Sequence, residues 1–225
     1  MPGPTERRRL VIVSLATALL FGCATMQTPQ MGLEAAYTRS ICEAAVKTPD
    51  AVRTLTPIDK AKREIAVAHV QPYPTLDSTR YIWVALPDEL RALCRNKKDA
   101  LLALEMALGL PPDPRDEKVF TFKISPNDLF RPCASSPDTT TTSCSLDLPR
   151  AAPADAESEH FVLKQMMDSY RTGFPSPGYP FTAMGWSYDW DPASTTHQGV
   201  SEYVTRLGAV ITDITSTTPA AFCEP

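Results

Sequence analysis

The sequence is poor in the side chains on which most metal and redox chemistry depends. It has only three histidines, His69, His160 and His197, and none of its six cysteines is followed three positions later by another. The spacing typical of zinc knuckles and of thioredoxin-like redox sites is therefore missing. A general base would have to come from the histidines or from carboxylates. We expect no metal and no cofactor.

An excess of positive charge is also missing. The chain has 22 Lys and Arg against 26 Asp and Glu, a formal net charge of −4. Binding to nucleic acid needs clustered lysines and arginines that neutralise phosphates. We therefore expect no nucleic-acid partner. The 22 prolines indicate long ordered connections rather than long helices, because proline interrupts a helix interior.

No apolar run is long enough to form a stable membrane-spanning helix. Leu10–Phe21 is almost wholly apolar, but as a helix it spans roughly 18–20 Å, short of the roughly 30 Å hydrocarbon core of a bilayer. Three arginines, residues 7–9, precede this run, and Cys23 follows it closely. Basic, apolar and small residues in this order are typical of a secretory signal peptide, which we place at residues 1–22.

The end of this segment, Leu20-Phe21-Gly22-Cys23, resembles the lipobox of bacterial lipoproteins. The resemblance implies a diacylglycerol group on Cys23, with the lipid bilayer as a partner of the protein. Ala24 lacks the acidic side chain that favours inner-membrane retention in such lipoproteins, which implies the outer membrane, facing the periplasm. The alternative is an ordinary signal peptide cut near Ala24, which would discard Cys23.

The remaining chain predicts one globular domain behind a short tether. Residues 23–30 form the polar, lipidated tether, and residues 31–225 form the domain, because about 200 residues can build one sizeable core. Loss of residues 1–22 removes three arginines and one glutamate, which moves the net charge from −4 to −6.

The five cysteines other than Cys23 indicate disulfide bonds in an oxidising compartment. Cys133 and Cys144 are the favoured pair, because the polar residues between them could not order themselves by burial. Cys42 and Cys94 lie in predicted helices and could pair with each other, although Cys223 competes for either. One cysteine must remain free.

Hydrophobic periodicity predicts an α+β fold with a small mixed or antiparallel sheet and about four helices. A final hairpin is expected, with strands at residues 200–205 and 209–215 around a turn at Leu207-Gly208. His69 alternates with apolar residues in one predicted strand, which favours a partly buried, hydrogen-bonded side chain over a ligand. The predicted helices cover residues 32–47, 87–94, 97–108 and 160–171. The predicted strands outside the hairpin cover residues 64–70, 81–86 and 119–124.

The densest functional candidate is the stretch YPFTAMGWSYDWD, residues 179–191. In an extended chain Trp186, Tyr188 and Trp190 share one face, and Asp189 and Asp191 lie on the other. Rings beside carboxylates suit a sugar, whose C–H faces stack on the rings, so these three aromatic residues are candidate ligand-binding residues. The alternative is that the ring face belongs to the core, where aromatic residues dominate the packing.

The same stretch supplies catalytic candidates. His197 is the only histidine near it, so catalysis would use His197 together with Asp189 and Asp191. The alternative is an exposed loop histidine without a catalytic role. Together, these features predict an envelope protein that binds or scaffolds a glycan or a protein partner. The competing hypothesis is a hydrolase or transferase that uses the carboxylates and His197.

Residues 201–215, SEYVTRLGAVITDIT, resemble the last hairpin of ADP-ribosyltransferases. In that family a glutamate opens a strand before a glycine turn, and the resemblance implies that Glu202 is a catalytic residue. The family's second acidic position falls on Val200, and its arginine and Ser-Thr-Ser motifs have no match here. The resemblance covers about fifteen residues.

Overall fold

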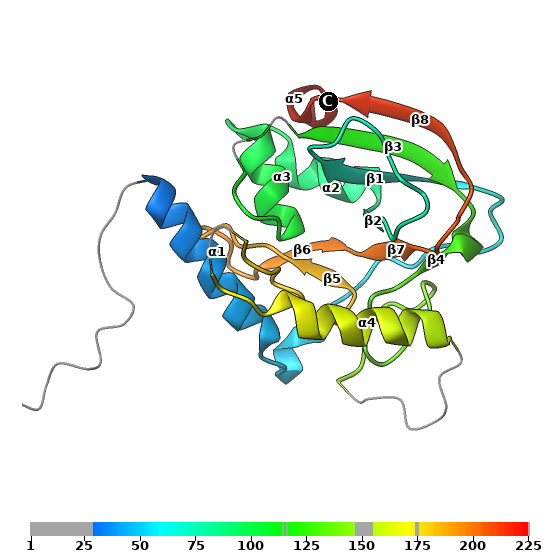
Figure 1. Cartoon of the computed structure of the whole chain (residues 1–225), viewed down its shortest axis with the longest axis horizontal. Helices are drawn as coiled ribbons and strands as arrows, with labels where there is room; N and C mark the ends of the chain where they lie inside the picture. Colours follow the sequence, from blue (N-terminus) through cyan, green and yellow to red (C-terminus); the bar gives the residue numbers. More distant parts are fainter. Residues whose placement is uncertain (1–28, 114, 116, 147–154, 174–175, 225) are drawn as a thin grey trace, which may run out of the picture.

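The computed structural model describes residues 29–224, except 114, 116, 147–154, 174 and 175 (Figure 1). The predicted signal peptide and Cys23 lie outside the described residues. Within that part of the chain the fold is α+β, as predicted, with five α-helices and three small antiparallel sheets. No helix in the described ranges combines the length and the apolar character needed to cross a bilayer.

A backbone bridge joins the first two of these sheets. In the first sheet, β3 (Lys118–Ile124) lies between β1 (Ile65–Gln71) and β8 (Ile211–Thr217). In the second, β7 (Tyr203–Thr205) lies between β2 (Trp83–Val84) and β4 (Leu129–Phe130). Ala85, directly after β2, exchanges two backbone hydrogen bonds with Ala68 of β1, at 2.9 and 3.0 Å, and so connects both sheets. Of the strand predicted at residues 81–86, only Trp83–Val84 forms, at one end of the second sheet, where Ala85 bridges to β1.

The third sheet pairs β5 (Trp186–Tyr188) with β6 (Gln198–Ser201). The predicted terminal hairpin is wrong. The turn at Leu207-Gly208 is present, but β7 and β8 belong to different sheets, and β8 pairs with β3 instead. β8 therefore completes a sheet that begins far away in the sequence, and the hairpin on which the ADP-ribosyltransferase resemblance depended does not form.

The helices begin and end where local chemistry predicts. α2 (Pro87–Cys94) begins with proline, and α3 (Ala100–Leu108) is capped by the Asp99 side chain, which accepts a bond from the Leu102 amide at 3.0 Å. Gly109, at φ +65°, ends α3 in the left-handed region that glycine tolerates. The remaining helices are α1 (Pro29–Ala45), α4 (Ala156–Ser169) and α5 (Pro219–Cys223).

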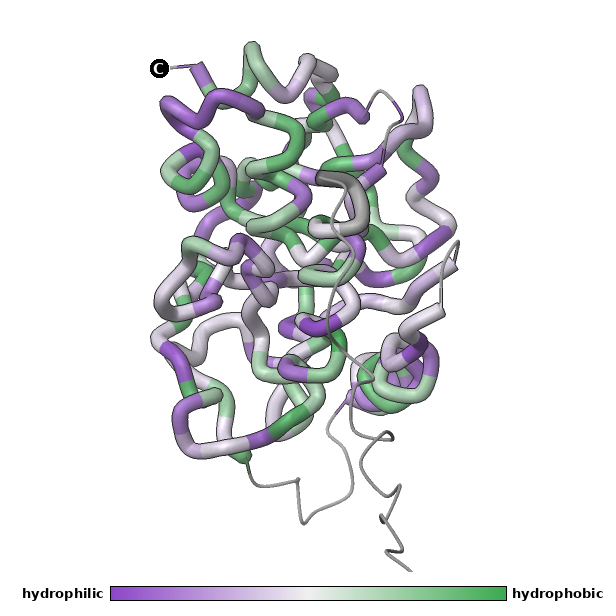
Figure 2. The backbone as a smooth tube through the Cα atoms, turned by 90° about the vertical axis from the view of Figure 1, so that its left-hand side faces the viewer, coloured by the Kyte–Doolittle hydropathy of each residue, from purple (hydrophilic) through white to green (hydrophobic). Residues whose placement is uncertain are grey.

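Helices α2, α3 and α5 gather beside the first sheet, whereas α1 and α4 lie on the other side of β5 and β6 (Figure 1). Figure 2 shows apolar and polar residues alternating along the whole path of the described backbone. One core cluster, under α1, contains Tyr37, Ile41 and the aromatic residues of the β5 region. A second links Leu90 and Leu104 of the helices to Val119 of β3. The elements form a single domain.

Two disulfides hold this domain. Cys133 and Cys144 are bonded to each other, as predicted. The possible Cys42–Cys94 pair is not formed: Cys94 is bonded to Cys223, and Cys42 is a free, exposed cysteine on α1. The reason is the position of α5, which packs beside α2 in the same core cluster and brings the two sulfur atoms together, whereas Cys42 faces solvent.

The loop between Cys133 and Cys144 is ordered by a buried arginine. The guanidinium group of Arg131 is fully buried and donates to the carbonyl oxygens of Thr56, Thr139 and Thr141 at 2.8, 3.1 and 3.2 Å. It also lies 4.8 Å from the ring centroid of Tyr203. A polar loop that cannot bury apolar side chains is thus held by its own backbone carbonyl groups.

Candidate functional site

The aromatic stretch is part of the core. Trp186, Tyr188 and Trp190 are only 5%, 7% and 2% exposed. Their polar atoms are used internally: the Trp186 indole donates to the carbonyl of Ala51 at 3.0 Å, and the Tyr188 hydroxyl donates to the carboxylate of Glu43 at 2.6 Å. The core interpretation is therefore confirmed, and these rings do not form an open platform for a sugar.

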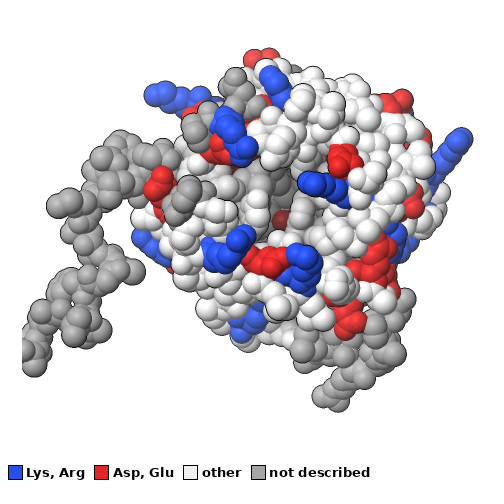
Figure 3. Space-filling view, viewed as in Figure 1, with Lys and Arg blue, Asp and Glu red and all other residues white. Residues whose placement is uncertain are grey.

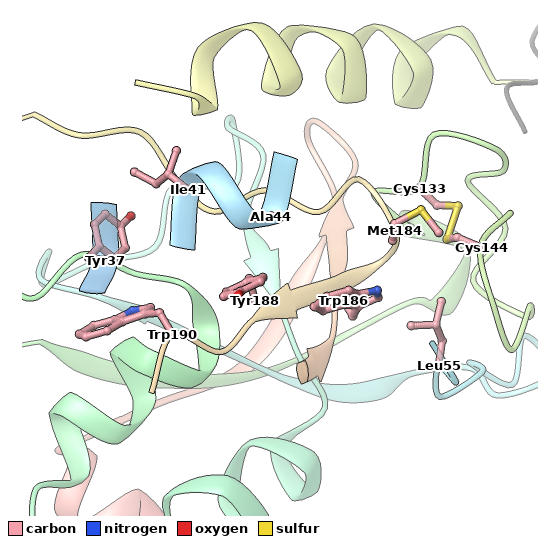
Figure 4. Packing of buried hydrophobic residues seen from close by; sticks show 10 residues of the cluster. All are labelled: Tyr37, Ile41, Ala44, Leu55, Cys133, Cys144, Met184, Trp186, Tyr188 and Trp190. Atoms are coloured by element: carbon pink, nitrogen blue, oxygen red, sulfur yellow. A yellow bond between two sulfur atoms is a disulfide. The ribbon is translucent and has the colours of Figure 1, made fainter. Parts of the chain in front are cut away.

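Helix α1 is the element that covers these rings. Tyr37, Ile41 and Ala44 of α1 belong to the same core cluster as the rings. Tyr37 lies beside Trp190 (Figure 4), and their rings meet edge to face at 5.7 Å. The sequence spacing of α1 showed an apolar face, but it could not show that this face would lie on residues 186–190.

The proposed catalytic group around His197 is not assembled. The His197 ring bonds through Nδ1 to the backbone carbonyl of Asp189 at 2.8 Å and stacks on Tyr188. The carboxylate of Asp189 accepts from the Asp191 amide, and the carboxylate of Asp191 faces Lys97 at 3.7 Å. These carboxylates thus stabilise a loop, and neither accepts a hydrogen bond from the histidine ring.

Glu202 lies elsewhere, in a pocket of about 410 Å³ that sequence patterns did not reveal. Figure 3, which has the same view as Figure 1, shows a hollow in the middle of the molecule. The hollow lies near the place where α3 ends and β6 runs in Figure 1. The lining comes from β1, β2, the end of α3, one residue of α4, the segment 179–181 and the side chains of Asp113, Arg115 and Glu117. Segments that are distant in sequence build this pocket, so no linear sequence motif could predict it.

Strand geometry aims Glu202 at the pocket. Successive side chains of an extended chain point to opposite faces. Both neighbours of Glu202 bind Thr56 on one face: the Ser201 hydroxyl accepts from its amide at 2.9 Å, and the Tyr203 hydroxyl donates to its carbonyl. Glu202 is therefore on the opposite face, where it lines the pocket.

The carboxyl group of Glu202 has no hydrogen-bond partner among the described residues. Burial raises its pKa from 4.5 to about 8, because the charged form is poorly solvated there. The Glu202 side chain is half-buried, and carboxyl groups whose pKa is raised in this way concentrate at functional sites. This is the clearest sign of function in the described chain.

A second acid in the lining has the same property. Glu117 is 6% exposed, and its Oε2 atom is buried without a partner in the described chain. Burial, and secondarily the charge of Asp113, raises the pKa of Glu117 to about 7. Asp113 is itself bound to Arg115, which lowers the pKa of Asp113. The pocket thus combines two unpartnered carboxyl groups with one satisfied ion pair.

His69 also lines the pocket, and the prediction of a partly buried, hydrogen-bonded side chain is confirmed. Its Nδ1 atom faces the carbonyl of Trp83 at 2.7 Å, and its Nε2 atom faces the Oε1 atom of Gln71 at 3.1 Å. Burial lowers the pKa of His69, and these two contacts oppose that shift. Both ring nitrogens are therefore engaged by the protein.

The fold and the pocket define a disulfide-bonded α+β domain with an acidic, partly aromatic pocket. Comparisons with protein families, with curated proteins and with solved structures give no significant match to this chain. Within the described ranges, no three His, Cys, Asp or Glu side chains cluster in a way that could hold a metal ion.

The Glu202 environment predicts how stability depends on pH. A carboxyl group with a raised pKa binds more protons in the folded state than in the unfolded state, so stability falls as pH rises from about 4.5 to about 8. Glu202→Gln cannot ionise and should escape this loss. We expect the variant to gain about 2–3 kcal/mol over the parent between pH 5 and pH 8 in urea unfolding.

Burial also raises the pKa values of Glu105 and Glu117, so they too make stability depend on pH. Their contributions cancel when the free energy of unfolding of the parent is subtracted from that of the variant. Glu159→Gln, in an exposed position on α4, is the matched control and should leave the pH profile unchanged. A difference between Glu202→Gln and the parent that does not vary with pH would show that Glu202 is well solvated.

Proposed function

We propose that this chain is a lipid-anchored protein of the bacterial envelope that binds a small molecule, or a small group carried on a polymer, in the Glu202 pocket. The observation that supports binding is the pocket itself, about 410 Å³ in volume, lined by the half-buried Glu202 and by Glu117, whose Oε2 atom is buried without a partner among the described residues. Pockets with mostly apolar walls and a few convergent polar groups are typical of ligand sites.

The anchor is proposed from the sequence around Cys23. α1 begins at Pro29, six positions after that cysteine. A connection of this length spans at most about 20 Å, so the domain would stay close to the lipid surface. Several acyl chains on one cysteine would hold the protein firmly, since each buried methylene contributes about 0.8 kcal/mol. Mass spectrometry of the mature N-terminus should show acylated Cys23, and an unmodified N-terminus at Ala24 would contradict the anchor.

A pocket-filling variant tests binding. Gln165 lines the pocket from α4, so Gln165→Trp should obstruct it without removing an acidic group. Lys164→Trp adds the same ring at the neighbouring exposed position and serves as the control. In an NMR screen of a fragment library, we expect fragments to shift the Trp83 indole resonance of the parent and of Lys164→Trp, but not of Gln165→Trp. If no fragment shifts any pocket resonance, the binding function is wrong.

Catalysis is the second candidate, because acids with raised pKa values can act as general acids near neutral pH. Glu202 and Glu117 would take this role, in place of the group around His197. An enzyme would convert a bound compound to product, and Glu202→Gln would abolish that conversion while leaving binding measurable. A binding protein would release the compound unchanged.

A further inference from the structure

The pocket offers acids but no available cation. Arg115 is the only lysine or arginine among the described lining residues, and its guanidinium group is bound to both carboxylate oxygens of Asp113, with Nε distances of 2.9 and 2.7 Å. The Oε2 atom of Glu117 is buried without a partner in the described chain, and the half-buried Glu202 lines the same pocket. An anionic ligand would enter beside these acids without a positive group to pair with.

His69 does not change this balance. A histidine can bind an anion only through a ring N–H, and both of its nitrogens face protein acceptors. The Gln71 amide nitrogen donates to the carbonyls of Tyr73 and Thr75, at 3.3 and 2.8 Å, which fixes its oxygen toward His69. The one buried side-chain atom of the described lining without a partner, Oε2 of Glu117, belongs to a carboxyl group, and an ionised carboxylate accepts hydrogen bonds, so a ligand that brings donors fits it.

The remaining walls suit an organic cation. Four aromatic residues line the pocket, and aliphatic side chains, proline and alanine fill most of the remainder. Aromatic faces attract cations, and apolar walls bury the alkyl part of a ligand. A volume of about 410 Å³ lies at the small end of ligand pockets, so it fits one short chain rather than a bulky ring system. The aromatic residues are Tyr73, Trp83, Tyr179 and Phe181.

We propose that the pocket binds a primary amine as its ammonium ion, with the Glu202 carboxylate as the counter-ion and the alkyl chain between the aromatic walls. This inference rests on the proposed binding function and specifies its ligand. An ammonium group supplies three N–H donors, which is what the unpartnered carboxyl oxygens need, whereas a quaternary ammonium group supplies none. The amine could be free or could be carried on a peptide.

Binding of this kind is coupled to proton release. Near pH 6 Glu202 is protonated, so an entering ammonium ion must displace its proton into water before the ion pair can form. Alkyl amines stay charged throughout this range, because their pKa lies near that of lysine, about 10.4. The other titratable groups that line the pocket are His69, Tyr73, Asp113, Arg115, Glu117 and Tyr179.

The affinity for an amine should therefore increase with pH. The binding-competent fraction of Glu202 rises roughly tenfold per pH unit below pH 8, and the apparent dissociation constant falls in proportion. Isothermal titration calorimetry with n-pentylamine at pH 6 and pH 8 should show at least a tenfold gain in affinity. n-Pentanol and pentyltrimethylammonium, which have the same alkyl chain, should bind at least tenfold more weakly than the amine at pH 8.

Three variants separate the amine site from a general effect on the fold. Glu202→Gln should weaken n-pentylamine binding at least tenfold at pH 8 and remove most of the pH dependence, leaving only the smaller part that comes from Glu117. Glu117→Gln should weaken it several-fold, and Glu159→Gln on α4 should bind as the parent does.

A pentapeptide with one lysine tests the source of the amine. Binding of the peptide as tightly as the amine indicates a polymer-borne group, and binding of the amine alone indicates a free ligand. Both results support the proposal.

The outcomes that overturn it are distinct from failure of the proposed function. Equal affinities for n-pentanol and n-pentylamine, or unchanged amine affinity in Glu202→Gln, refute the ammonium ligand. If neutral or anionic fragments still shift the Trp83 indole resonance, the pocket remains a binding site of another specificity. If neither the amines nor any library fragment bind, both the ligand and the binding function are wrong.

Discussion

Replacement of both Cys94 and Cys223 by alanine should lower the free energy of unfolding by about 4–5 kcal/mol. The two cysteines are separated by 129 positions, so their bond closes a loop that takes in more than half of the described chain. In the chain-entropy model, a loop of this size confers about 4–5 kcal/mol by restricting the unfolded state. Urea unfolding without reductant measures this loss of stability. Reduction of the disulfides in the parent protein should also lower its free energy of unfolding.

Two comparisons make this expectation specific. Removal of the Cys133–Cys144 bond, which spans 11 positions, should lower stability by only about 2–3 kcal/mol because the loop is short. Cys42→Ala should change it by less than about 0.5 kcal/mol, since that side chain is exposed and unpaired. If the Cys94 and Cys223 double variant loses no more stability than Cys42→Ala does, the Cys94–Cys223 bond does not stabilise the fold.

Arg131→Met should destabilise the domain by about 3–5 kcal/mol, because several buried carbonyl groups lose a charged donor and cannot reach water. Methionine fills much of the same volume, so the loss reports the hydrogen bonds rather than a cavity. The guanidinium group binds Thr139 and Thr141 of the disulfide loop. Amide exchange should therefore accelerate at Leu55 and Ile58, whose amides donate to carbonyls of this loop at 2.8 Å.

The control is Arg63→Met, which removes an arginine from an exposed position and should change stability by less than about 0.5 kcal/mol. Unfolding in urea, with amide exchange measured on the same samples, tests both variants. Equal stability of Arg131→Met and the parent would mean that water replaces the guanidinium group at the carbonyls.

Local chemistry predicted the elements well. Pro87 and Gly109 mark helix boundaries where the sequence placed them, and alternation located β1 and β3 to within a residue or two. These features depend on neighbouring residues, whose preferences act within one turn or one strand. The Cys133–Cys144 bond was also predicted from a local feature, because the polar residues between the two cysteines could not order themselves by burial.

Long-range pairing escaped prediction. The pairing of β8 with β3, rather than β7, and the bond from Cys94 to Cys223 both depend on how distant segments pack. The pocket is of this kind as well: Glu202 was a candidate through a local resemblance, whereas Glu117 and His69 join it only in the folded chain. An unpartnered buried acid leaves no pattern in sequence, because its neighbours in space come from other elements.

The free thiol of Cys42 has a practical consequence. It is exposed on α1, and it is the only cysteine in the described part of the chain that lies outside both disulfides. A maleimide fluorophore would label the folded domain there without reduction of either cross-link. Energy transfer from that dye to a labelled vesicle would then test the proposed lipid anchor, because only a protein held at the bilayer brings the dye on α1 close to the lipid.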